Sequence, residues 1–488
     1  MADETKSERA FDLRALEKDH KNVHFIGIGG ISMSCLAQIL KSRGFRVMGS
    51  DYKASEATER LKAAGIPVTI GHSADNIADD TDLVVFTAAI KPDNPEYVRA
   101  AQKNIRVIGR AALLGAIMDG YERAVCVAGT HGKTTTTSLI SEILIKAGLD
   151  PTITVGGMLP SIKSGGEIGG SGGGGSNFRL GGGPHFVVES CEYADSFLNF
   201  YPFAAAILNV EADHLDYFKD IGAITRSFAR FAGNIDANGF LVINNEIPML
   251  REILRGAKCR AVTFGAGGQW QMGNLAFDGD GCCAFDVIRG GKTLGEIRLK
   301  VPGAHNAYNA LAAAAVAYEL GVGFDAISRA LGEYRGVRRR FEFKGNYRGA
   351  AVIDDYAHHP SEIAATLAAA ANTRHNKLWC VFQPHTYSRT KALFEELAAA
   401  FSRADYLILT DIYAAREKDT GEVNSRMLAE RVRKLWGERA GNVMYIKSFD
   451  EITDYLKQRL GVNPAENDLL ITMGAGDVYL VGEALLDK

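Results

Sequence analysis

The chain has 488 residues, of which 47% are hydrophobic and 23% are charged, and its formal net charge is −3. This composition is typical of a folded protein of about three domains, and the small charge gives no electrostatic basis for binding nucleic acid or an anionic membrane. The seven cysteines form no C-x-x-C pair, and no apolar run is long enough to cross a bilayer. We therefore expect free thiols in a cytoplasmic protein without a membrane span.

Residues 1–21 are charged and lack the apolar centre of a signal peptide, so we expect a disordered tail. Residues 22–120 alternate strand and helix patterns, which predicts a parallel sheet covered by helices. Strands are expected at 23–28, 45–49, 67–70 and 83–87, and helices at 31–42, 56–64 and 96–103.

The first strand ends in Gly27-Ile-Gly-Gly-Ile-Ser32, and Asp51 ends the second strand. This pattern is close to the dinucleotide fingerprint G-x-G-x-x-G, in which an acidic residue about 20 positions later binds a ribose. It predicts a ligand that contains a pyrophosphate. A nicotinamide or flavin cofactor, and a glycine turn with only a structural role, are the alternatives.

The next segment, 121–336, carries the strongest motif of the chain. An apolar strand at 123–128 ends in Gly129-Thr-His-Gly-Lys-Thr-Thr135, and a helical pattern follows. Amides of a tight glycine loop and of a helix N-terminus bind phosphate, the Lys133 ammonium suits the β- and γ-phosphates, and the Thr134 hydroxyl can ligate Mg²⁺. The spacing G-x-x-G-K-T is shorter than the standard pattern, so a chance strand–turn–helix corner is the alternative. We expect ATP or GTP here.

Further strands are expected at 185–189 and 205–208, β-rich pieces at 239–299, and helices at 223–232 and 305–320. The glycine-rich stretch 165–183 has few side chains that can pack, which predicts a flexible insertion.

Polar residues follow several of these strands. Glu189 ends one strand, and His214 lies in the acidic loop 209–216 after another, so these two and Thr134 are the candidate Mg²⁺ ligands. A solvated carboxylate and a structural histidine are the alternatives. His305, Asn306 and Asn309 open a helix and suit an adenine edge, although helix capping competes with this interpretation.

Residues 337–488 return to strand–helix alternation, with strands expected at 350–354, 378–382, 406–410 and 469–473. Arg340 lies at the junction with the preceding segment and could reach a γ-phosphate when domains close, although a solvated basic patch is the alternative. Asp355 and His358 follow one strand, and His385 and Arg389 follow the next. Two such polar turns predict a cleft shared with the nucleotide domain.

In this order the motifs resemble those of the Mur ligases of peptidoglycan synthesis. The resemblance covers nearly the whole chain from residue 23, and it is carried by residues 24–30, 129–136, 211–217, 305–309, 339–342, 354–360 and 382–385. It implies an α/β protein of three domains. These are a Rossmann-like N-terminal domain (22–120) that binds a UDP-sugar, a central P-loop ATPase-like domain (121–336) with a mostly parallel sheet, and a Rossmann-like C-terminal domain (337–488).

Within the family the motifs are most similar to the member that uses ATP and Mg²⁺ to attach L-alanine to the lactyl carboxylate of UDP-N-acetylmuramate. The implied reaction passes through an acyl phosphate, and an amine then displaces phosphate. Catalytic roles are implied for Lys133, Glu189, His214, Arg340 and His358. A recycling ligase that attaches a preformed peptide is the closer alternative, and an NAD-dependent dehydrogenase is the more remote one.

The resemblance also implies the binding residues. Those for the UDP-sugar are Gly27, Gly29, Gly30, Ile31, Ser32, Ser50, Asp51, Thr87, Ala88, Ala89 and Asn94. Those for ATP are Gly129, Thr130, His131, Gly132, Lys133, Thr134, Thr135, His305, Asn306, Asn309, Arg340 and Asp355. His358, His385 and Arg389 would bind the amino acid. We expect a monomer or weak homodimer whose domains close on the substrates.

Overall fold

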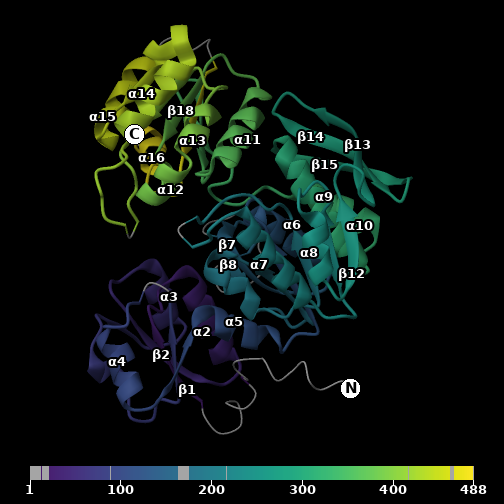
Figure 1. The fold of residues 1–488 in the computed structure, drawn as a ribbon, viewed down its shortest axis with the longest axis vertical. Coiled ribbons are helices and arrows are strands. Elements are labelled where there is room, and N and C mark those ends of the chain that lie inside the picture. Colours follow the sequence, from purple (N-terminus) through teal and green to yellow (C-terminus); the bar gives the residue numbers. More distant parts are fainter. Residues whose placement is uncertain are drawn as a thin grey trace.

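The computed structural model describes Leu13 and residues 21–87, 90–162, 175–215, 217–415, 417–461 and 467–486. The chain forms three α/β units, each built around its own sheet, that follow one another along the long axis of the molecule (Figure 1). This confirms the predicted fold class. Within the described part of the chain, no helix has the length and apolarity that a bilayer crossing requires.

The N-terminal unit contains a five-stranded parallel sheet in the order β3-β2-β1-β4-β5. Its strands are β1 (Asn22–Ile26), β2 (Arg46–Asp51), β3 (Val68–Ile70), β4 (Leu83–Phe86) and β5 (Arg106–Gly109). Its helices are α2 (Ile31–Ser42), α3 (Glu56–Ala63), α4 (Pro95–Gln102) and α5 (Arg110–Met118). The strand order reverses between β1 and β4, and such a switch point is where open parallel sheets bind ligands.

The central unit contains a ten-stranded sheet in the order β15-β14-β13-β12-β11-β10-β6-β9-β7-β8. The strands are β6 (Arg123–Ala128), β7 (Thr152–Leu159), β8 (Ser176–Arg179), β9 (His185–Glu189), β10 (Ala204–Ile207), β11 (Phe240–Asn244), β12 (Arg260–Phe264), β13 (Trp270–Phe277), β14 (Cys282–Arg289) and β15 (Lys292–Pro302). Pairing is parallel from β7 to β13 and antiparallel at both ends, which confirms a mostly parallel sheet.

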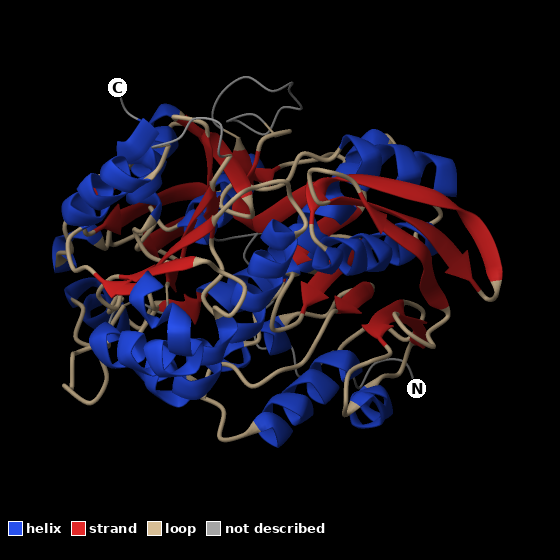
Figure 2. Ribbon diagram, turned by 90° about the horizontal axis from the view of Figure 1, so that it is seen from above, coloured by secondary structure: helices blue, strands red, loops and turns tan. Residues whose placement is uncertain are grey.

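The helices of this unit are α6 (Lys133–Lys146), α7 (Ile221–Gly233), α8 (Leu250–Gly256), α9 (Ala304–Glu319) and α10 (Phe324–Glu333), with a 3₁₀ segment, η2, at Tyr193–Asn199. Helices pack on the sheets (Figure 2), and the turn between β13 and β14 contacts the C-terminal unit, where Asp280 forms a β-bridge with Thr373.

The glycine-rich stretch differs from the prediction of a flexible insertion. Residues 176–179 form β8, which pairs antiparallel with β7. Phe178 is only 8% exposed and belongs to the core, and Arg179 donates a hydrogen bond to the carbonyl of Pro151 at 2.6 Å. Asn177 also donates from Nδ2 to the carbonyl of Ile31 at 3.4 Å, so backbone pairing and side-chain contacts together attach this edge strand. The preceding residues, 163–174, lie outside the described residues.

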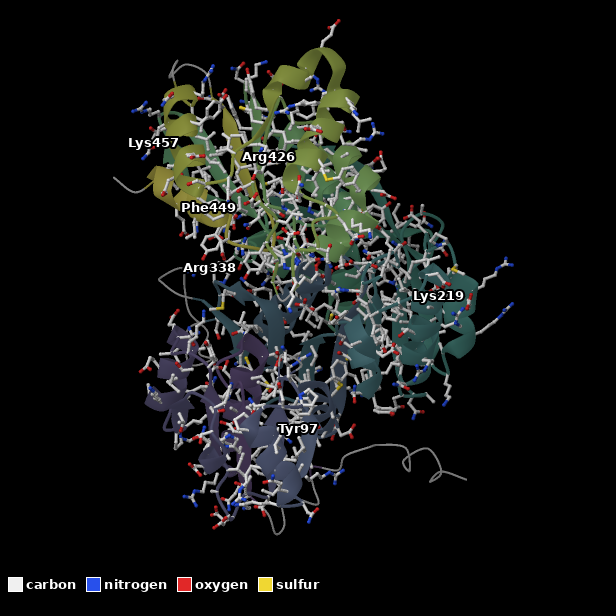
Figure 3. All side chains as sticks on the ribbon, turned by 60° about the vertical axis from the view of Figure 1, so that its left-hand side comes forward. Tyr97, Lys219, Arg338, Arg426, Phe449 and Lys457 are labelled. Atoms are coloured by element: carbon white, nitrogen blue, oxygen red, sulfur yellow. The ribbon has the colours of Figure 1, made fainter. Side chains whose placement is uncertain are left out.

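The C-terminal unit has a six-stranded sheet in the order β16-β17-β21-β18-β19-β20, parallel except for β16. Its strands are β16 (Glu342–Tyr347), β17 (Ala350–Asp355), β18 (Leu378–Phe382), β19 (Tyr406–Leu409), β20 (Val443–Tyr445) and β21 (Leu469–Met473). Its helices are α11 (Pro360–Ala371), α12 (Tyr387–Ala392), α13 (Phe394–Ala400), α14 (Ser425–Trp436), α15 (Phe449–Arg459) and α16 (Tyr479–Leu486). Arg338 marks its junction with the central unit (Figure 3).

One apolar core joins the N-terminal and central units. Cys126 of β6 contacts Met118 of α5 through their sulfur atoms at 3.9 Å, and the ring of Tyr121 lies 4.8 Å from that of Phe186. Leu13 is 2% exposed in the same core, so the expectation of a wholly disordered tail over residues 1–21 is wrong at this residue. The cores of the C-terminal unit contain none of these residues.

Candidate active site

The glycine loop after β6 requires glycine at two positions. Gly129 and Gly132 have φ angles of 142° and 79°, which favour glycine. A Cβ on Gly132 would lie 2.5 Å from Oδ1 of Asn309. The loop continues into α6, whose first turn has no side-chain cap. Backbone N–H groups there are available to phosphate oxygens, as predicted for a phosphate-binding loop.

Asn209, which follows β10, fixes the shape of this loop. Its Oδ1 accepts a hydrogen bond from the amide of His131 at 2.7 Å, and its Nδ2 donates to the carbonyl of His131 at 3.1 Å. The Thr130 hydroxyl accepts a hydrogen bond from the amide of Glu211 at 2.9 Å. Since β6 and β10 are adjacent, the loop is held by its neighbouring strand.

Lys133 lies folded against its own loop. Its Nζ donates to the carbonyls of Gly129 at 2.5 Å and Thr130 at 3.1 Å, and it forms an ion pair of 3.1 Å with Glu192. Burial acts against the ammonium, but Glu192, Cys191 and Glu189 together outweigh it and raise the pKa of Lys133. The lysine is therefore charged. Sequence reasoning missed Glu192, although its position three residues after Glu189 was a usable signal.

The three predicted metal ligands lie around one cavity of about 540 Å³. The Thr134 hydroxyl donates to Glu189 at 2.9 Å, and Glu189 also accepts a hydrogen bond from the amide of Gly156 at 2.6 Å. His214 lines the same cavity, and burial lowers its pKa, which leaves a neutral ring nitrogen. Hard oxygen donors and a neutral imidazole form a chemically suitable set for a divalent cation, with Mg²⁺ preferring the oxygens.

The same cavity extends to the C-terminal unit, because it is also lined by Arg338, Arg340, Tyr356 and His358. Burial lowers the pKa of His358 to about 4, and it lowers that of His385 to about 4 as well. Both rings are therefore neutral near pH 7. The structure brings Lys133, Glu189, His214, Arg340 and His358 together around this cavity, as the sequence predicted.

A second cavity, of about 280 Å³, contains most of the predicted nucleotide residues. It is lined by His131, Gly132, Thr135, His305, Asn306, Asn309, Arg340 and Asp355, among others. Asn306 donates from Nδ2 to the carbonyl of Pro302 at 2.7 Å, but α9 begins after Gly303 without a side-chain cap, so the capping alternative is wrong for Asn306. Burial raises the pKa of Asp355 to about 6 although two amides donate to it.

A polar network joins the phosphate loop to the C-terminal unit. His131 Nε2 lies 3.2 Å from Glu211, which accepts a hydrogen bond from Ser361, and Nδ1 of His131 lies 3.5 Å from Glu362. Burial disfavours the imidazolium, but the two carboxylates raise the pKa of His131 to about 9. His359 Nε2 lies 3.2 Å from the carbonyl of Ala212. The positive charge on His131 in the phosphate loop is thus held by one carboxylate of the central unit and one of the C-terminal unit, so it contributes to the contact between these two units.

A third cavity, of about 820 Å³, is lined by His385 and Arg389, two of the three residues predicted for the amino acid, whereas His358 lines the cavity of about 540 Å³. Arg389 donates to Oδ1 of Asp213 from Nε at 3.1 Å and from Nη2 at 3.0 Å, and its Nη1 lies 3.1 Å from Nδ1 of His385. The ring centroids of His358 and His385 are 5.6 Å apart. These residues form one group, with Arg389 paired across the interface to the central unit.

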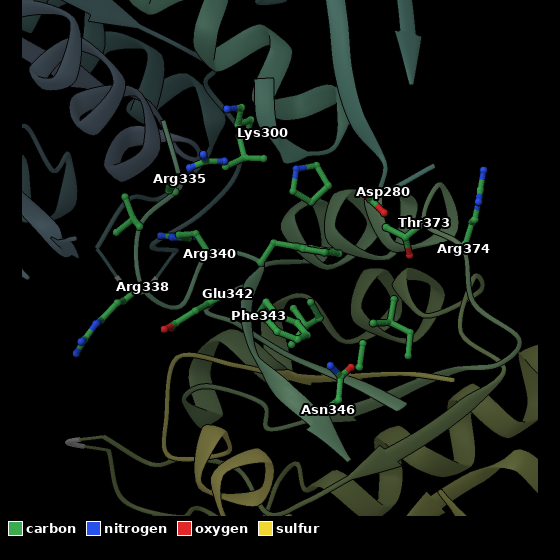
Figure 4. A pocket seen from close by; sticks show the side chains of 18 of the residues that line it. Asp280, Lys300, Arg335, Arg338, Arg340, Glu342, Phe343, Asn346, Thr373 and Arg374 are labelled. Carbon is green, nitrogen blue, oxygen red and sulfur yellow. The ribbon is translucent and has the colours of Figure 1, made fainter. Parts of the chain in front are cut away.

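Arg340 also borders a cavity of about 710 Å³ on the other side of the junction, which is rich in cations (Figure 4). Lys300, Arg335, Arg338 and Arg374 line it together with Glu342. Arg340 itself lies 3.6 Å from Glu362. Burial acts against the charged guanidinium, but Glu362 and Asp355 together raise its pKa, so it stays charged beside the nucleotide cavity.

The predicted sugar-nucleotide loop occupies the switch point between β1 and β4. Gly27 has a φ of 80°, and a Cβ there would lie 2.7 Å from Cγ2 of Thr87. The amide of Gly29 donates to Asp51 at 2.8 Å, which fixes the turn. The turn continues through Gly30 into Ile31 and Ser32 of α2.

Two other predicted residues of this loop make internal bonds. Ser50 is fully buried and donates to Glu96 at 2.6 Å, and Asn94 caps α4 by accepting from the amide of Glu96 at 2.9 Å. Their side chains therefore support the loop from inside, as opposed to lining its surface. Ala88 and Ala89 lie outside the described residues.

Each of the three units matches a known protein family. Residues 22–122 match the family described as Mur ligase family, catalytic domain, residues 127–317 match the Mur ligase middle domain, and residues 339–476 match the Mur ligase, glutamate ligase domain. The UDP-N-acetylmuramate–L-alanine ligase of Acetivibrio thermocellus is 49% identical over 96% of each chain. That of Caldanaerobacter subterraneus is also 49% identical, over 97% of this chain and 98% of the relative.

Solved structures agree with these matches. The UDP-N-acetylmuramate–alanine ligase of Thermotoga maritima superposes with a TM-score of 0.76 at 30% identity, covering 96% of this chain and 98% of the other. A murein peptide ligase from Psychrobacter arcticus superposes with a TM-score of 0.66 at 25% identity over the same shares.

Gly132→Ala tests whether the loop conformation is needed. We expect weaker ATP binding and a loss of stability above the roughly 1–2 kcal/mol that a left-handed alanine costs, because the new Cβ would collide with Asn309. Gly148→Ala is the matched control, since Gly148 has a φ of 74° at the other end of α6 and nothing within 4 Å of its Cβ position. Calorimetry and thermal melting measure both effects. Equal ATP affinity and equal melting temperature of Gly132→Ala and Gly148→Ala would contradict the argument that the new Cβ collides with Asn309.

The network around His131 predicts a pH-dependent stability. Its folded pKa of about 9 lies above the usual 6.5, so its contribution is complete below pH 6.5 and is lost as the pH rises through 9. Melting temperatures of wild type and Glu211→Gln should therefore differ most near pH 6.5 and converge above pH 9. Glu396→Gln, on the exposed surface of α13, is the control, and its melting temperature should differ from that of wild type by an amount that does not change with pH. If the difference in melting temperature between wild type and Glu211→Gln stays constant with pH, that result would contradict the assignment of a positive charge to His131.

Proposed function

The chain belongs to the Mur ligase family, and we propose that it joins L-alanine to UDP-N-acetylmuramate in peptidoglycan synthesis, converting ATP to ADP and phosphate. The observation that carries this proposal is the match, over nearly the whole length of both chains, to ligases named for these two substrates. The geometry supports it, because residues from the central and C-terminal units meet around one cavity next to the phosphate loop.

ATP would bind with its phosphates in the 129–135 loop and its adenine in the cavity of about 280 Å³. His305, Asn306 and Asn309 line that cavity and offer donors and acceptors to the adenine edge. Asp355 also lines it, on the side of the C-terminal unit. Because both units contribute, full nucleotide contact requires that they stay close together.

The first chemical step would be attack of a lactyl carboxylate oxygen on the γ-phosphorus. A new P–O bond forms, the bond to the β–γ bridging oxygen breaks, and ADP leaves with that electron pair. The charged groups of Lys133 and Arg340 line the cavity where this charge shifts, and they would stabilise it electrostatically. Lys133 must exchange part of its contact with Glu192 for phosphate oxygens in this step.

In the second step the alanine amine would attack the acyl carbon of the acyl phosphate. The tetrahedral intermediate collapses, the C–O bond to phosphate breaks, and an amide remains. The attacking amine must lose a proton, and the neutral His358 and His385 rings are acceptors on the C-terminal side. Arg389 is the cation that would bind the alanine carboxylate, which would then compete with Asp213.

Thr134, Glu189 and His214 would hold Mg²⁺, and the ion would supply charge compensation for the phosphates. Their donors already converge on one cavity, and Thr134 and Glu189 are in direct contact. A cytoplasmic location and a monomeric or weakly dimeric state belong to the same proposal, as do domain limits at residues 22–120, 121–336 and 337–488.

Phosphate release in the presence of UDP-N-acetylmuramate, ATP and Mg²⁺ tests the activity. We expect release with L-alanine and little with a preformed tripeptide, and we expect a chelator of divalent cations to abolish it. Turnover with the tripeptide alone would replace this proposal with the peptide-recycling ligase. A change in nicotinamide absorbance without ATP use would favour the dehydrogenase.

Lys133→Ala tests the role of the phosphate loop. We expect kcat to fall by about 1,000-fold or more, since charge stabilisation of the transferred phosphoryl group is lost, while thermal melting shows a folded protein. Lys146→Ala is the matched control on the same helix, because its side chain is 36% exposed and pairs with Glu333 on the surface. Near wild-type turnover by Lys133→Ala would show that the loop does not act in catalysis.

A further inference from the structure

Three side chains that can bind a metal, other than the proposed Mg²⁺ ligands, meet where the central and C-terminal units touch. His131 and Glu211 belong to the central unit and His359 to the C-terminal unit, and one ligand atom of each lies within 4.8 Å of the others. Nε2 of His131 is 3.2 Å from Oε2 of Glu211. Two ligands of a tetrahedral Zn²⁺ with bonds of about 2.0–2.1 Å are roughly 3.3 Å apart, so this pair already has the spacing that zinc requires.

The hydroxyl of Ser361 lies at the centre of this group. Its Oγ is 2.8 Å from Nδ1 of His359 and 3.4 Å from Nε2 of His131, and it donates a hydrogen bond to Glu211. One oxygen atom therefore contacts a candidate ligand atom of all three residues. A cation bound at this point would take the Ser361 hydroxyl, or a water that displaces it, as its fourth ligand.

The second nitrogen of each ring is held as it is in metal-bound histidines. Nδ1 of His359 accepts from the amide of Ser361 at 3.4 Å, so Nε2 carries the proton and donates to the carbonyl of Ala212 at 3.2 Å. Nδ1 of His131 lies 3.5 Å from Oε1 of Glu362. Metal-binding imidazoles donate their other N–H to a carbonyl or a carboxylate, which orients the free nitrogen toward the ion. Both rings therefore direct their free nitrogen toward Ser361.

The same group already stabilises one positive charge. Glu211 and Glu362 overcome the effect of burial and raise the pKa of His131 to about 9. A cation beside Ser361 would replace that proton and would be stabilised by the same two carboxylates. Burial lowers the pKa of His359, so this ring is neutral and has an electron pair for a metal.

We propose that His131, Glu211 and His359 bind Zn²⁺, and that the bound ion inhibits the enzyme by joining the central unit to the C-terminal unit. Two imidazoles and one carboxylate favour Zn²⁺ over Mg²⁺, which prefers oxygen ligands and retains its waters. His131, Glu211 and Ser361 also line the nucleotide cavity, so the ion would lie at its edge and oppose the opening that nucleotide exchange requires. The inhibitory role rests on the proposed function, whereas the metal site does not.

Calorimetry with Zn²⁺ alone, in the absence of nucleotide and Mg²⁺, tests the site. Wild type should bind Zn²⁺ strongly. Glu211→Gln and His359→Gln should bind it at least about 100-fold more weakly, since loss of a residue that only supports a ligand already costs about 10–100-fold. His214→Ala should bind as wild type does, because His214 belongs to the proposed Mg²⁺ site. His375→Gln is the matched control in the C-terminal unit, where Nδ1 of His375 lies 2.9 Å from the carbonyl of Thr373 in its own loop.

Two results would overturn the metal site. One is weak or absent binding of Zn²⁺ by wild type. The other is strong binding that is lost in His214→Ala and retained in both Glu211→Gln and His359→Gln, which would assign the ion to the Mg²⁺ ligands.

Co²⁺ provides a spectroscopic check, because it takes the same ligands as Zn²⁺. Wild type should give the visible absorption bands of four-coordinate Co²⁺, Zn²⁺ should remove them, and Glu211→Gln and His359→Gln should lack them. A spectrum of six-coordinate Co²⁺ in wild type would contradict the tetrahedral site. Thermal melting without metal shows whether each variant is folded, and added Zn²⁺ should raise Tm in wild type but not in the variants. Since Glu211 and His359 lie in different units, one folded variant is sufficient for the test.

The inhibitory role is tested by phosphate release at saturating substrates and Mg²⁺, with free Zn²⁺ fixed by a metal buffer. Zn²⁺ should stop turnover of wild type, whereas His359→Gln should retain most of the rate that it has without Zn²⁺. Equal fractional inhibition of wild type and His359→Gln would overturn this role. If wild type binds Zn²⁺ as expected but releases no phosphate with L-alanine in its absence, the proposed function fails while the metal site stands.

Discussion

The hydrogen bonds between Asn209 and the backbone of His131 are the constraint on which the site depends. They join the loop after β6 to the loop after β10, and they hold the glycine turn in a shape that an alanine at Gly132 could not adopt without strain. Lys133 and Thr134 follow directly, so the placement of both side chains derives from this contact. A rigid loop also lowers the entropic cost of placing Lys133, Thr134 and the loop amides around one ligand.

The protonation states of the other site residues depend on nearby carboxylates and on burial. Glu192 keeps Lys133 protonated, Glu211 and Glu362 keep His131 protonated, and burial keeps His214, His358 and His385 neutral. The charged Lys133 and His131 therefore lie in the phosphate loop, the neutral His358 and His385 lie in the C-terminal unit, and the neutral His214 lines the same cavity as Thr134 and Glu189. Nearby carboxylates outweigh burial at the protonated groups, whereas burial prevails at the neutral rings, although His358 lies 3.4 Å from Glu362 and His214 lies 3.7 Å from Asp213.

Local patterns were sufficient to predict most of the fold. The strands at 123–128, 185–189, 378–382 and 469–473 and the helix at 31–42 have the predicted limits, because apolar runs and glycine turns mark such elements directly. Residues 176–179 of the glycine-rich stretch were predicted wrongly, since they form an edge strand held by backbone pairing with β7 and by the contacts of Phe178 and Arg179. Glu192 was missed although its spacing from Glu189 was a usable signal, whereas Glu362 could not be identified, because its significance arises from contacts with residues distant in sequence such as His131.

The two junctions between units differ in chemistry, and this gives the molecule a mechanical asymmetry. Between the N-terminal and central units the contact is apolar and continuous with one core, which resists shear. Between the central and C-terminal units it consists of ion pairs and hydrogen bonds such as Asp213–Arg389 and Glu211–Ser361. Polar contacts exchange readily with water and dissolved ions. The first two units should therefore move as a single block, and the third should pivot against it along a seam that ionic strength can loosen.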